Sequence, residues 1–193
     1  MGKIIAIGGE PATGKSTLMK AWMKDYEWEE VKLTDLLYGL WCKELNTIVL
    51  GKDYFDESQM FCGTDRLSMA VQPKAIEWFK GSFKPSGVNI VFEGDRLFTA
   101  SFLAEIVAQE HEIRMIYIKA TQSTLDERHA SRGDNQDDKF LNSRKTKLSN
   151  ILSNFELMPY IEEYEHNNNT DQAVLVSTIL GELNSIDGKV VQR

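Results

Sequence analysis

A short apolar run that leads directly into a glycine-rich loop constrains this chain more than any other feature. The run Lys3–Ile7 is rich in isoleucine, and Gly9–Ser16 after it reads G-E-P-A-T-G-K-S, which fits the pattern G-x-x-x-x-G-K-[ST]. Glycines at the two fixed positions let successive backbone N–H groups turn toward a polyphosphate. The sequence therefore predicts a buried strand, a phosphate-binding loop and then a helix over Ser16–Lys24, whose positive dipole end faces the phosphates.

The loop predicts a nucleoside triphosphate as ligand, with ATP and Mg²⁺ as the expected cofactors. In this pattern the lysine neutralises β- and γ-phosphate oxygens, which makes Lys15 a catalytic candidate, and the hydroxyl of Ser16 binds Mg²⁺. A glycine-rich turn without a ligand is the alternative. The residues expected to hold the nucleotide are Gly9, Glu10, Pro11, Ala12, Thr13, Gly14, Lys15, Ser16 and Thr17.

Length and charge restrict the class of protein. The chain has 193 residues, enough for one domain with a sizeable core, and we expect a single domain over residues 1–193. Its net charge of -7 argues against a protein that coats nucleic acid without specificity, but it does not exclude a local basic groove.

The sequence gives no sign of a zinc site, a disulfide framework or a membrane segment. Cys42 and Cys62 lack metal-ligand spacing, and the histidines His111, His129 and His166 are scattered. The first apolar run is too short for a secretory signal, and no run approaches the length of a membrane span. We therefore expect reduced thiols, no membrane partner and a cytoplasmic location, in the host cytoplasm if the protein is phage-encoded.

Apolar runs alternate with amphipathic stretches along the chain, which predicts an α/β fold with helices on both faces of a parallel sheet. The predicted strands are Lys3–Ile7, Val31–Leu33, Val88–Phe92 and Arg114–Ile118. After the first helix, the predicted helices are Thr34–Lys43, Thr64–Phe79, Thr99–Glu110, Thr121–Ser131, Lys139–Phe155 and Thr170–Leu183. Ligands of such sheets bind at the carboxyl ends of the strands, so residues after Ile7, Phe92 and Ile118 are the functional candidates.

Charged residues directly follow the strand Val88–Phe92. Asp95 and Glu93 are candidates to hold Mg²⁺ through water or to accept a proton from an attacking hydroxyl. We name Asp95 with Ser16 as the metal candidates. Arg96 is a candidate phosphate ligand. A strand-end turn with solvent-facing charges is the alternative, and the sequence leaves open which carboxylate is the base.

A second charged pair begins the predicted helix Thr64–Phe79. Asp65 can cap this helix, Arg66 can bind an anion, and the amide of Gln72 can bind a base edge. A capped amphipathic helix explains these residues equally well.

Two arginines one helical turn apart precede a polar, glycine-containing break. Arg128 and Arg132 share a helix face, and the break 133–138 follows them, so we predict a lid over about 128–147 that brings an arginine to the transferred phosphoryl group. The basic run Arg144–Lys147 either extends the phosphate site or is simply solvated.

These motifs together resemble the nucleotide-kinase branch of P-loop proteins. The stretch Asp65–Gln72 is similar to the D-R-Y-x-S-x-x-A-Y-Q stretch of thymidylate kinases, although it is one residue shorter between Ser and Ala and lacks the tyrosines. That resemblance implies substrate-binding roles for Asp65, Arg66 and Gln72, lid roles for Arg128 and Arg132, and a P-loop kinase-type three-layer sandwich with an arginine-containing lid. The loop itself departs from the F-E-G-x-D/E-G-x-G-K-S/T of that family.

The run Gly63–Pro73, together with Phe92–Leu97, Gln136 and Arg144–Lys147, also looks like a phage group of small P-loop kinases. That resemblance implies phosphorylation of hydroxymethyluracil already built into DNA, as part of thymidine hypermodification. Such a base must be flipped out or single-stranded to enter a pocket, and Arg128–Lys147 is the basic stretch available for a DNA backbone.

The resulting prediction is a kinase that uses ATP and Mg²⁺ on a nucleotide-like acceptor, with hydroxymethyluracil in DNA ranked above a free deoxynucleoside monophosphate. A small-metabolite kinase, such as one acting on gluconate or shikimate, has the same fold and is an alternative that the sequence does not exclude. A GTPase switch is disfavoured because no N-K-x-D motif follows the later strands. A non-catalytic nucleotide-binding module and a homodimer are further alternatives that the sequence leaves open.

Overall fold

A seven-stranded sheet forms the centre of the protein in this computed structural model, which describes residues 2–56, 58, 61–83, 86–132 and 138–184. The strand order is β2-β3-β4-β5-β1-β6-β7. The strands span β1 (Ile4–Gly9), β2 (Glu29–Lys32), β3 (Tyr38–Cys42), β4 (Thr47–Leu50), β5 (Asn89–Glu93), β6 (Ile113–Lys119) and β7 (Ile161–Glu165).

Strand β1 lies in the middle of the sheet, and all six of its residues are buried. It pairs in parallel with β5 on one side and with β6 on the other, so that Ile7 lies opposite Glu93 and Gly9 lies opposite Ile118. Strands β4 and β7 extend the parallel part of the sheet. Because parallel strands end at the same edge, the segments after β1, β5 and β6 come together there.

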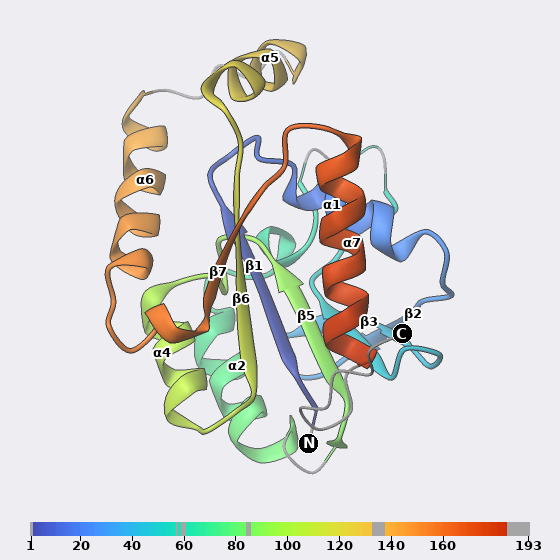
Figure 1. The fold of residues 1–193 in the computed structure, drawn as a ribbon. Coiled ribbons are helices and arrows are strands. Elements are labelled where there is room, and N and C mark those ends of the chain that lie inside the picture. Colours follow the sequence, from blue (N-terminus) through green and yellow to red (C-terminus); the bar gives the residue numbers. More distant parts are fainter. Residues whose placement is uncertain (1, 57, 59–60, 84–85, 133–137, 185–193) are drawn as a thin grey trace.

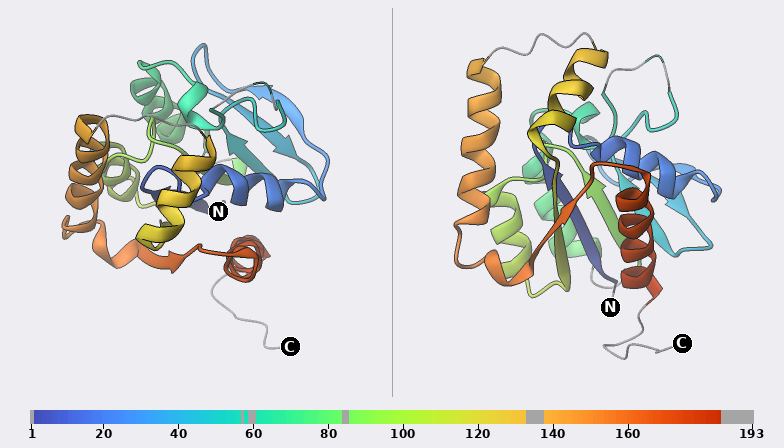
Figure 2. Two further views of the ribbon diagram at one scale, coloured as in Figure 1. Left: turned by 90° about the horizontal axis from the view of Figure 1, so that it is seen from above. Right: turned by 45° about the horizontal axis from the view of Figure 1, so that its top comes forward.

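Helices cover both faces of the sheet (Figures 1 and 2). On one face, α2, α4 and α6 pack over a core that includes Phe79, Phe92 and Phe102, and on the other face α1 and α7 pack over Ile5, Leu18 and Ile179. The helices span α1 (Lys15–Met23), α2 (Val71–Trp78), α4 (Ala100–Ala108), α5 (Gln122–Arg132), α6 (Asp138–Leu152) and α7 (Asn169–Asn184).

Helix α5 stands apart from the two helical layers. It follows β6 and lies beyond the carboxyl edge of the sheet, at the top of the molecule in Figure 1. This three-layer arrangement with a mostly parallel sheet confirms the predicted α/β three-layer sandwich. The break predicted at 133–138 lies almost entirely outside the described residues, and so does Gln136.

The prediction of a helix over Thr34–Lys43 is wrong. Strands β2, β3 and β4 form an antiparallel meander there, so the sheet is mixed rather than wholly parallel. The hydroxyl of Thr34 does accept backbone N–H bonds, as a helix cap would, but from Leu36 and Leu37 in the turn before β3. The capping signal therefore marks a tight turn instead of a helix start.

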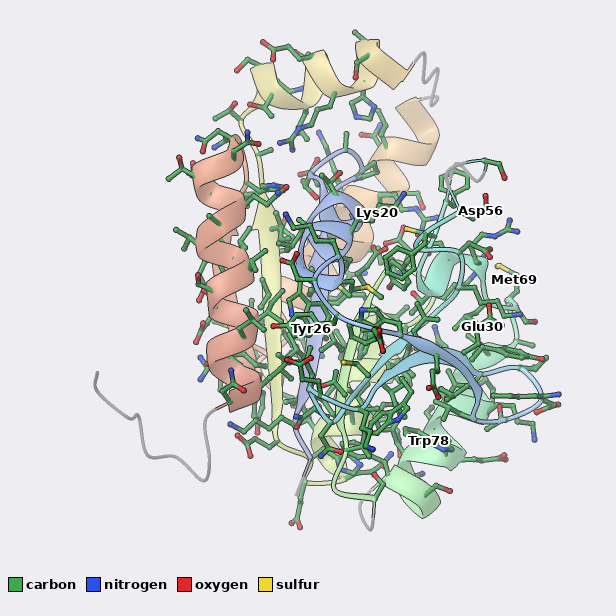
Figure 3. All side chains as sticks on the ribbon, turned by 90° about the vertical axis from the view of Figure 1, so that its right-hand side faces the viewer. Lys20, Tyr26, Glu30, Asp56, Met69 and Trp78 are labelled. Atoms are coloured by element: carbon green, nitrogen blue, oxygen red, sulfur yellow. The ribbon has the colours of Figure 1, made fainter. Side chains whose placement is uncertain are left out.

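The prediction of one helix over Thr64–Phe79 is also wrong in its first half. A single 3₁₀ turn, η1 (Thr64–Arg66), is followed by a non-helical stretch, and α2 begins only at Val71. Met69 lies in that stretch with 77% of its side chain exposed, at the edge of the molecule in Figure 3. Pro73 therefore falls in the first turn of α2, where its missing N–H costs little.

Besides β3, two further strands were not predicted from the sequence. Strand β4 is fully buried between β3 and β5, whereas β7 (I-E-E-Y-E) is an edge strand with exposed glutamates. The other predicted strands and the helices after residue 99 are confirmed within a few residues at each end. The C-terminal residues 185–193, which we expected to fray, lie outside the described residues.

The aromatic cluster under α2 and α4 gives a test of this packing. Phe79 is fully buried and contacts Phe83, Phe102 and His111 ring to ring. Phe79→Ala should lower the free energy of unfolding by roughly 3–5 kcal/mol, because it removes apolar contacts and leaves a cavity. Urea unfolding followed by circular dichroism measures the change.

The matched control for this prediction is Phe155→Ala. Phe155 is 88% exposed, so its truncation should change the free energy of unfolding by less than about 0.5 kcal/mol. Equal losses in the two variants would contradict the proposed core.

Candidate active site

The loop between β1 and α1 has the backbone geometry of an anion-binding loop. Gly14, the N-cap of α1, lies in the left-handed region at φ 90° and ψ 20°, and no side chain caps the helix there. Ala12 also has a positive φ of 63°. The first N–H groups of α1 are thus left for a ligand, and the helix dipole favours a negative one.

The side chain of Lys15 lies over this loop. Its ammonium group donates to the carbonyl oxygens of Gly9 at 2.9 Å and Glu10 at 3.0 Å. Thr13 closes the loop from the inside, since its hydroxyl donates to the same Glu10 carbonyl at 2.8 Å. The ammonium therefore lies at the mouth of the loop, next to the start of α1.

His166 supports the loop from the connection between β7 and α7. It is only 3% exposed, and its Nδ1 lies 2.8 Å from the carbonyl oxygen of Thr13. Because a carbonyl oxygen only accepts, Nδ1 carries the proton. A Cβ on Gly14 would lie 2.6 Å from this ring. The sequence analysis named His166 only as one of three scattered histidines and gave it no contact with the phosphate loop.

The structure also places one predicted lid arginine at the loop. Arg128, on α5, donates from Nη1 to the carbonyl oxygen of Ala12 at 3.1 Å. The other, Arg132, is the last residue of α5, and its side chain lies outside what the structure describes. Helix α5 is therefore joined to the phosphate loop through Arg128.

Glu93 lies at the end of β5 with only 2% of its surface exposed. Its Oε1 accepts a hydrogen bond from the hydroxyl of Ser16 at 3.1 Å, and the thiol of Cys62 lies 3.9 Å from the same oxygen. Burial raises the pKa of the Glu93 carboxyl to about 7, against the opposing effect of the Lys15 ammonium. A buried carboxylate beside the Ser16 hydroxyl has the electrostatics of a cation ligand.

The segment that carries Asp65 packs against the segment after β5. The hydroxyl of Thr64 donates to the Glu93 carbonyl at 2.7 Å, and the Asp95 N–H donates to the Asp65 carboxylate at 2.8 Å. Gly94, at φ 107°, allows this approach, because a Cβ there would lie 2.6 Å from the Thr64 hydroxyl. Burial, and then the charge of Asp95, raise the pKa of Asp65.

Two basic residues of α6 hold Asp95 from the other side. Arg144 lies 2.8 Å from the Asp95 carboxylate, and the Lys147 ammonium donates to the Asp95 carbonyl at 2.5 Å. Of the two candidate carboxylates, Glu93 is therefore the one beside Ser16, while Asp95 faces the basic side of α6.

The remaining predicted substrate residues surround this pair of segments. Arg66 pairs with Asp53 at 2.6 Å, and its side chain is 41% exposed. The amide of Gln72 donates to the Arg96 carbonyl at 2.7 Å, so it holds the loop after β5. Thr17 is exposed on α1. Asp65, Asp95 and Arg96 therefore lie together in the site, whereas the side chains of Arg66 and Gln72 bind other groups of the protein.

A groove of about 400 Å³ lies between α6 and the carboxyl end of β6. Lys145 faces it and lies 3.9 Å from the Glu10 carboxylate. The groove is lined by Glu10, Tyr117, Lys145, Leu148, Ser149, Leu152 and Ser153. Lys145 thus points away from Asp95, unlike its neighbours Arg144 and Lys147.

Within the described ranges, no three His, Cys, Asp or Glu side chains converge to hold a metal ion by themselves. A cation beside Ser16 and Glu93 would therefore need further ligands from a bound phosphate or from water, which is the usual situation of Mg²⁺. None of the helices in the described part of the chain is long and apolar enough to cross a membrane.

Comparison with known proteins identifies the family. A family model described as P-loop Nucleotide Kinase3 matches residues 1–173. A crystal structure of an uncharacterized protein from Eubacterium ventriosum ATCC 27560 is similar over 96% of this chain and 100% of that chain, at 14% identity. The TM-score of this match is 0.48. No curated protein matches the chain.

The raised pKa of Glu93 predicts a pH-dependent stability in buffer without metal or nucleotide. A carboxyl whose pKa is about 7 in the folded state, against 4.5 in the unfolded chain, stabilises the fold below pH 4.5, and this stability is lost as the pH rises through 7. Glu93→Gln removes the ionisation. Between pH 4.5 and 8, the free energy of unfolding of the parent protein should therefore fall by on the order of 3 kcal/mol relative to that of the variant. Urea unfolding at the two pH values measures the difference.

Glu156→Gln is the control, because Glu156 is exposed after α6 and its substitution should leave the pH profile unchanged. A Glu93→Gln profile parallel to that of the parent protein would show that the pKa of Glu93 does not differ between the folded and unfolded states.

Proposed function

The chain belongs to the P-loop nucleotide kinase 3 family, and from this premise we propose that it transfers the γ-phosphoryl group of ATP to a hydroxyl of a nucleotide-like acceptor. The observation that carries the proposal is the contact between Ser16 of the phosphate loop and the buried Glu93. It joins the nucleotide side of the site to the segment after β5, on which Asp95 and Arg96 lie. Phosphoryl transfer needs these two halves next to each other.

On the nucleotide side, the free N–H groups at the start of α1 bind the phosphates, and Lys15 neutralises their charge. Lys15 now donates to two loop carbonyls, and a phosphate oxygen is the stronger acceptor that replaces them. Arg128 lies one hydrogen bond from the loop, within reach of the phosphates, and we propose that it stabilises the charge that develops during transfer, together with Arg132.

Ser16 and Glu93 fit Mg²⁺, because a hydroxyl and a buried carboxylate are oxygen ligands and no basic side chain among the described residues forms an ion pair with this carboxylate. When bound, Mg²⁺ neutralises negative charge on the β- and γ-phosphates. We favour Glu93 over Asp95 as its carboxylate ligand, since Asp95 is engaged by Arg144.

On the acceptor side, we propose that Asp65 and Asp95 orient the acceptor hydroxyl. Its oxygen forms a bond to the γ-phosphorus, the bond from that phosphorus to the bridging oxygen of ADP breaks, and the hydroxyl proton passes to the Asp65–Asp95 pair. The raised pKa of Asp65 suits a group that takes up a proton.

The presence of this carboxylate pair favours an alcohol as acceptor. A phosphate acceptor is already ionised at neutral pH and needs no base, whereas an alcohol must lose its proton. We therefore rank a hydroxymethylpyrimidine within DNA, as in thymidine hypermodification, above a free deoxynucleoside monophosphate.

Lys15→Ala tests the nucleotide half. Loss of the ammonium removes charge stabilisation from the transition state and should lower turnover by at least about 100-fold, while the fold stays intact. Release of ADP from ATP and acceptor measures the turnover. Lys24→Ala removes the same charge from the exposed end of α1 and should leave turnover unchanged. Full activity of Lys15→Ala would refute the assignment.

A labelled-phosphate experiment tests the acceptor. With γ-labelled ATP, we expect label on an oligodeoxynucleotide that contains hydroxymethyluracil. Label on thymidylate alone would instead favour the monophosphate kinase, and label on gluconate or shikimate alone a metabolite kinase. ATP binding without transfer to any of these would point to a non-catalytic module.

A further inference from the structure

The segment between β7 and α7 is fixed by hydrogen bonds to the end of β6 and to α7. The backbone N–H of His166 donates to the carbonyl oxygen of Lys119, the last residue of β6, at 2.8 Å. The side-chain oxygen of Asn167 accepts the N–H of Thr121 at 2.8 Å, and the N–H of Asn167 donates to the Asp171 carboxylate at 2.7 Å. The backbone that carries the His166 ring is therefore held independently of the phosphate loop.

The ring of His166 contacts two consecutive residues of the phosphate loop. Its segment passes beside the loop after β1 at the carboxyl edge of the sheet (Figure 1), and its Nδ1 donates to the Thr13 carbonyl oxygen at 2.8 Å. A Cβ on Gly14 would lie 2.6 Å from both Nδ1 and Cε1, so the ring packs directly against the Gly14 backbone. Only 3% of His166 is exposed.

Gly14 sets the start of α1. It is the N-cap of this helix at φ 90° and ψ 20°, and no side chain caps the helix there. Lys15 and Ser16, the proposed phosphate and Mg²⁺ ligands, follow it directly. Because glycine adopts many backbone conformations, Gly14 needs outside contacts to keep this one. His166 supplies the closer contact, since Nη1 of Arg128 would lie 3.4 Å from the same Cβ.

The Thr13 carbonyl needs the donor that His166 provides. Thr13 is only 1% exposed, and its bond to the ring is buried. A buried carbonyl oxygen without a donor is rare in folded proteins because it costs free energy. Without the ring, the loop would turn this oxygen toward another donor or toward water, and the observed conformation would become one of several.

We propose that His166 is a positioning residue for nucleotide binding, which acts through Thr13 and Gly14 to keep the phosphate loop in the conformation that accepts ATP. This inference rests on the nucleotide half of the proposed function and adds a residue that no motif of the sequence assigned. The apparent affinity of a ligand falls with the fraction of protein in the competent conformation. A loop that is competent about one tenth of the time therefore binds about 10-fold more weakly.

Calorimetry with a non-hydrolysable ATP analogue and Mg²⁺ tests the proposal. His166→Leu removes the donor at similar volume and should weaken binding roughly 10-fold or more. His166→Asn keeps an N–H donor at the position of Nδ1 and should restore the affinity to within about threefold of the parent protein. If His166→Leu does not fold, His166→Gln replaces it, because its amide lies one bond further from the backbone.

His111→Leu is the matched control. His111 is also buried, at 4% exposed, but it packs against Phe79 and Phe83 in the core under α2 and α4, away from the phosphate loop. This substitution should lower the midpoint of thermal unfolding and leave the affinity for the ATP analogue within about twofold.

Steady-state kinetics separate positioning from a general structural role. His166→Leu should raise KM for ATP roughly 10-fold, keep kcat within about threefold and leave KM for the acceptor unchanged, since bound ATP selects the competent loop. A variant that is merely partly unfolded would instead lose kcat in proportion to the unfolded protein and keep its KM for ATP.

Unchanged affinity in His166→Leu, equal losses in His166→Leu and His166→Asn, or an equal loss in His111→Leu would each overturn the proposal. A fall in kcat with constant KM for ATP would also overturn it. Failure of the proposed function gives a different result, namely a parent protein that does not bind the ATP analogue or does not transfer a phosphoryl group.

Discussion

The rest of the structure depends on how β1 ends. This strand is buried on both faces and hydrogen-bonded on both sides, so its carboxyl end is fixed in space. The chain then turns through the left-handed residue Gly14 directly into α1. Because β5 and β6 run parallel to β1, they deliver Glu93 and α5 to the same edge. The position of every candidate group is set relative to this one junction.

Local sequence signals predicted the parts of the fold in which chain neighbours determine the structure. The loop Gly9–Ser16 and the strand before Glu93 combine apolar runs with glycines at fixed spacing. Strand β7 could not be predicted in this way, since I-E-E-Y-E is an edge strand with exposed glutamates and has no apolar run. Strand β3 was predicted as a helix because Thr34 bonds the backbone N–H groups of a turn in the way that it would bond those of a helix start.

The candidate site was predictable only in its residue types. Asp65 was read as a helix cap, and its carboxylate does accept a backbone N–H bond, but that N–H belongs to Asp95, thirty positions away. The partners of Glu93 and Asp95 likewise come from α1 and α6. His166 had no local signal at all, because its contact with Thr13 spans 153 positions. Such pairings follow from the sheet order, which the sequence pattern leaves undetermined.

The bond between His166 and the Thr13 carbonyl also acts on the next N–H of the loop. In a trans peptide the carbonyl and the following N–H point in opposite directions, so holding the oxygen of Thr13 toward His166 turns the N–H of Gly14 away from it. The orientation of that dipole is therefore established when the chain folds. A phosphate that arrives later meets a group already aligned and does not have to order it, which lowers the entropic cost of binding.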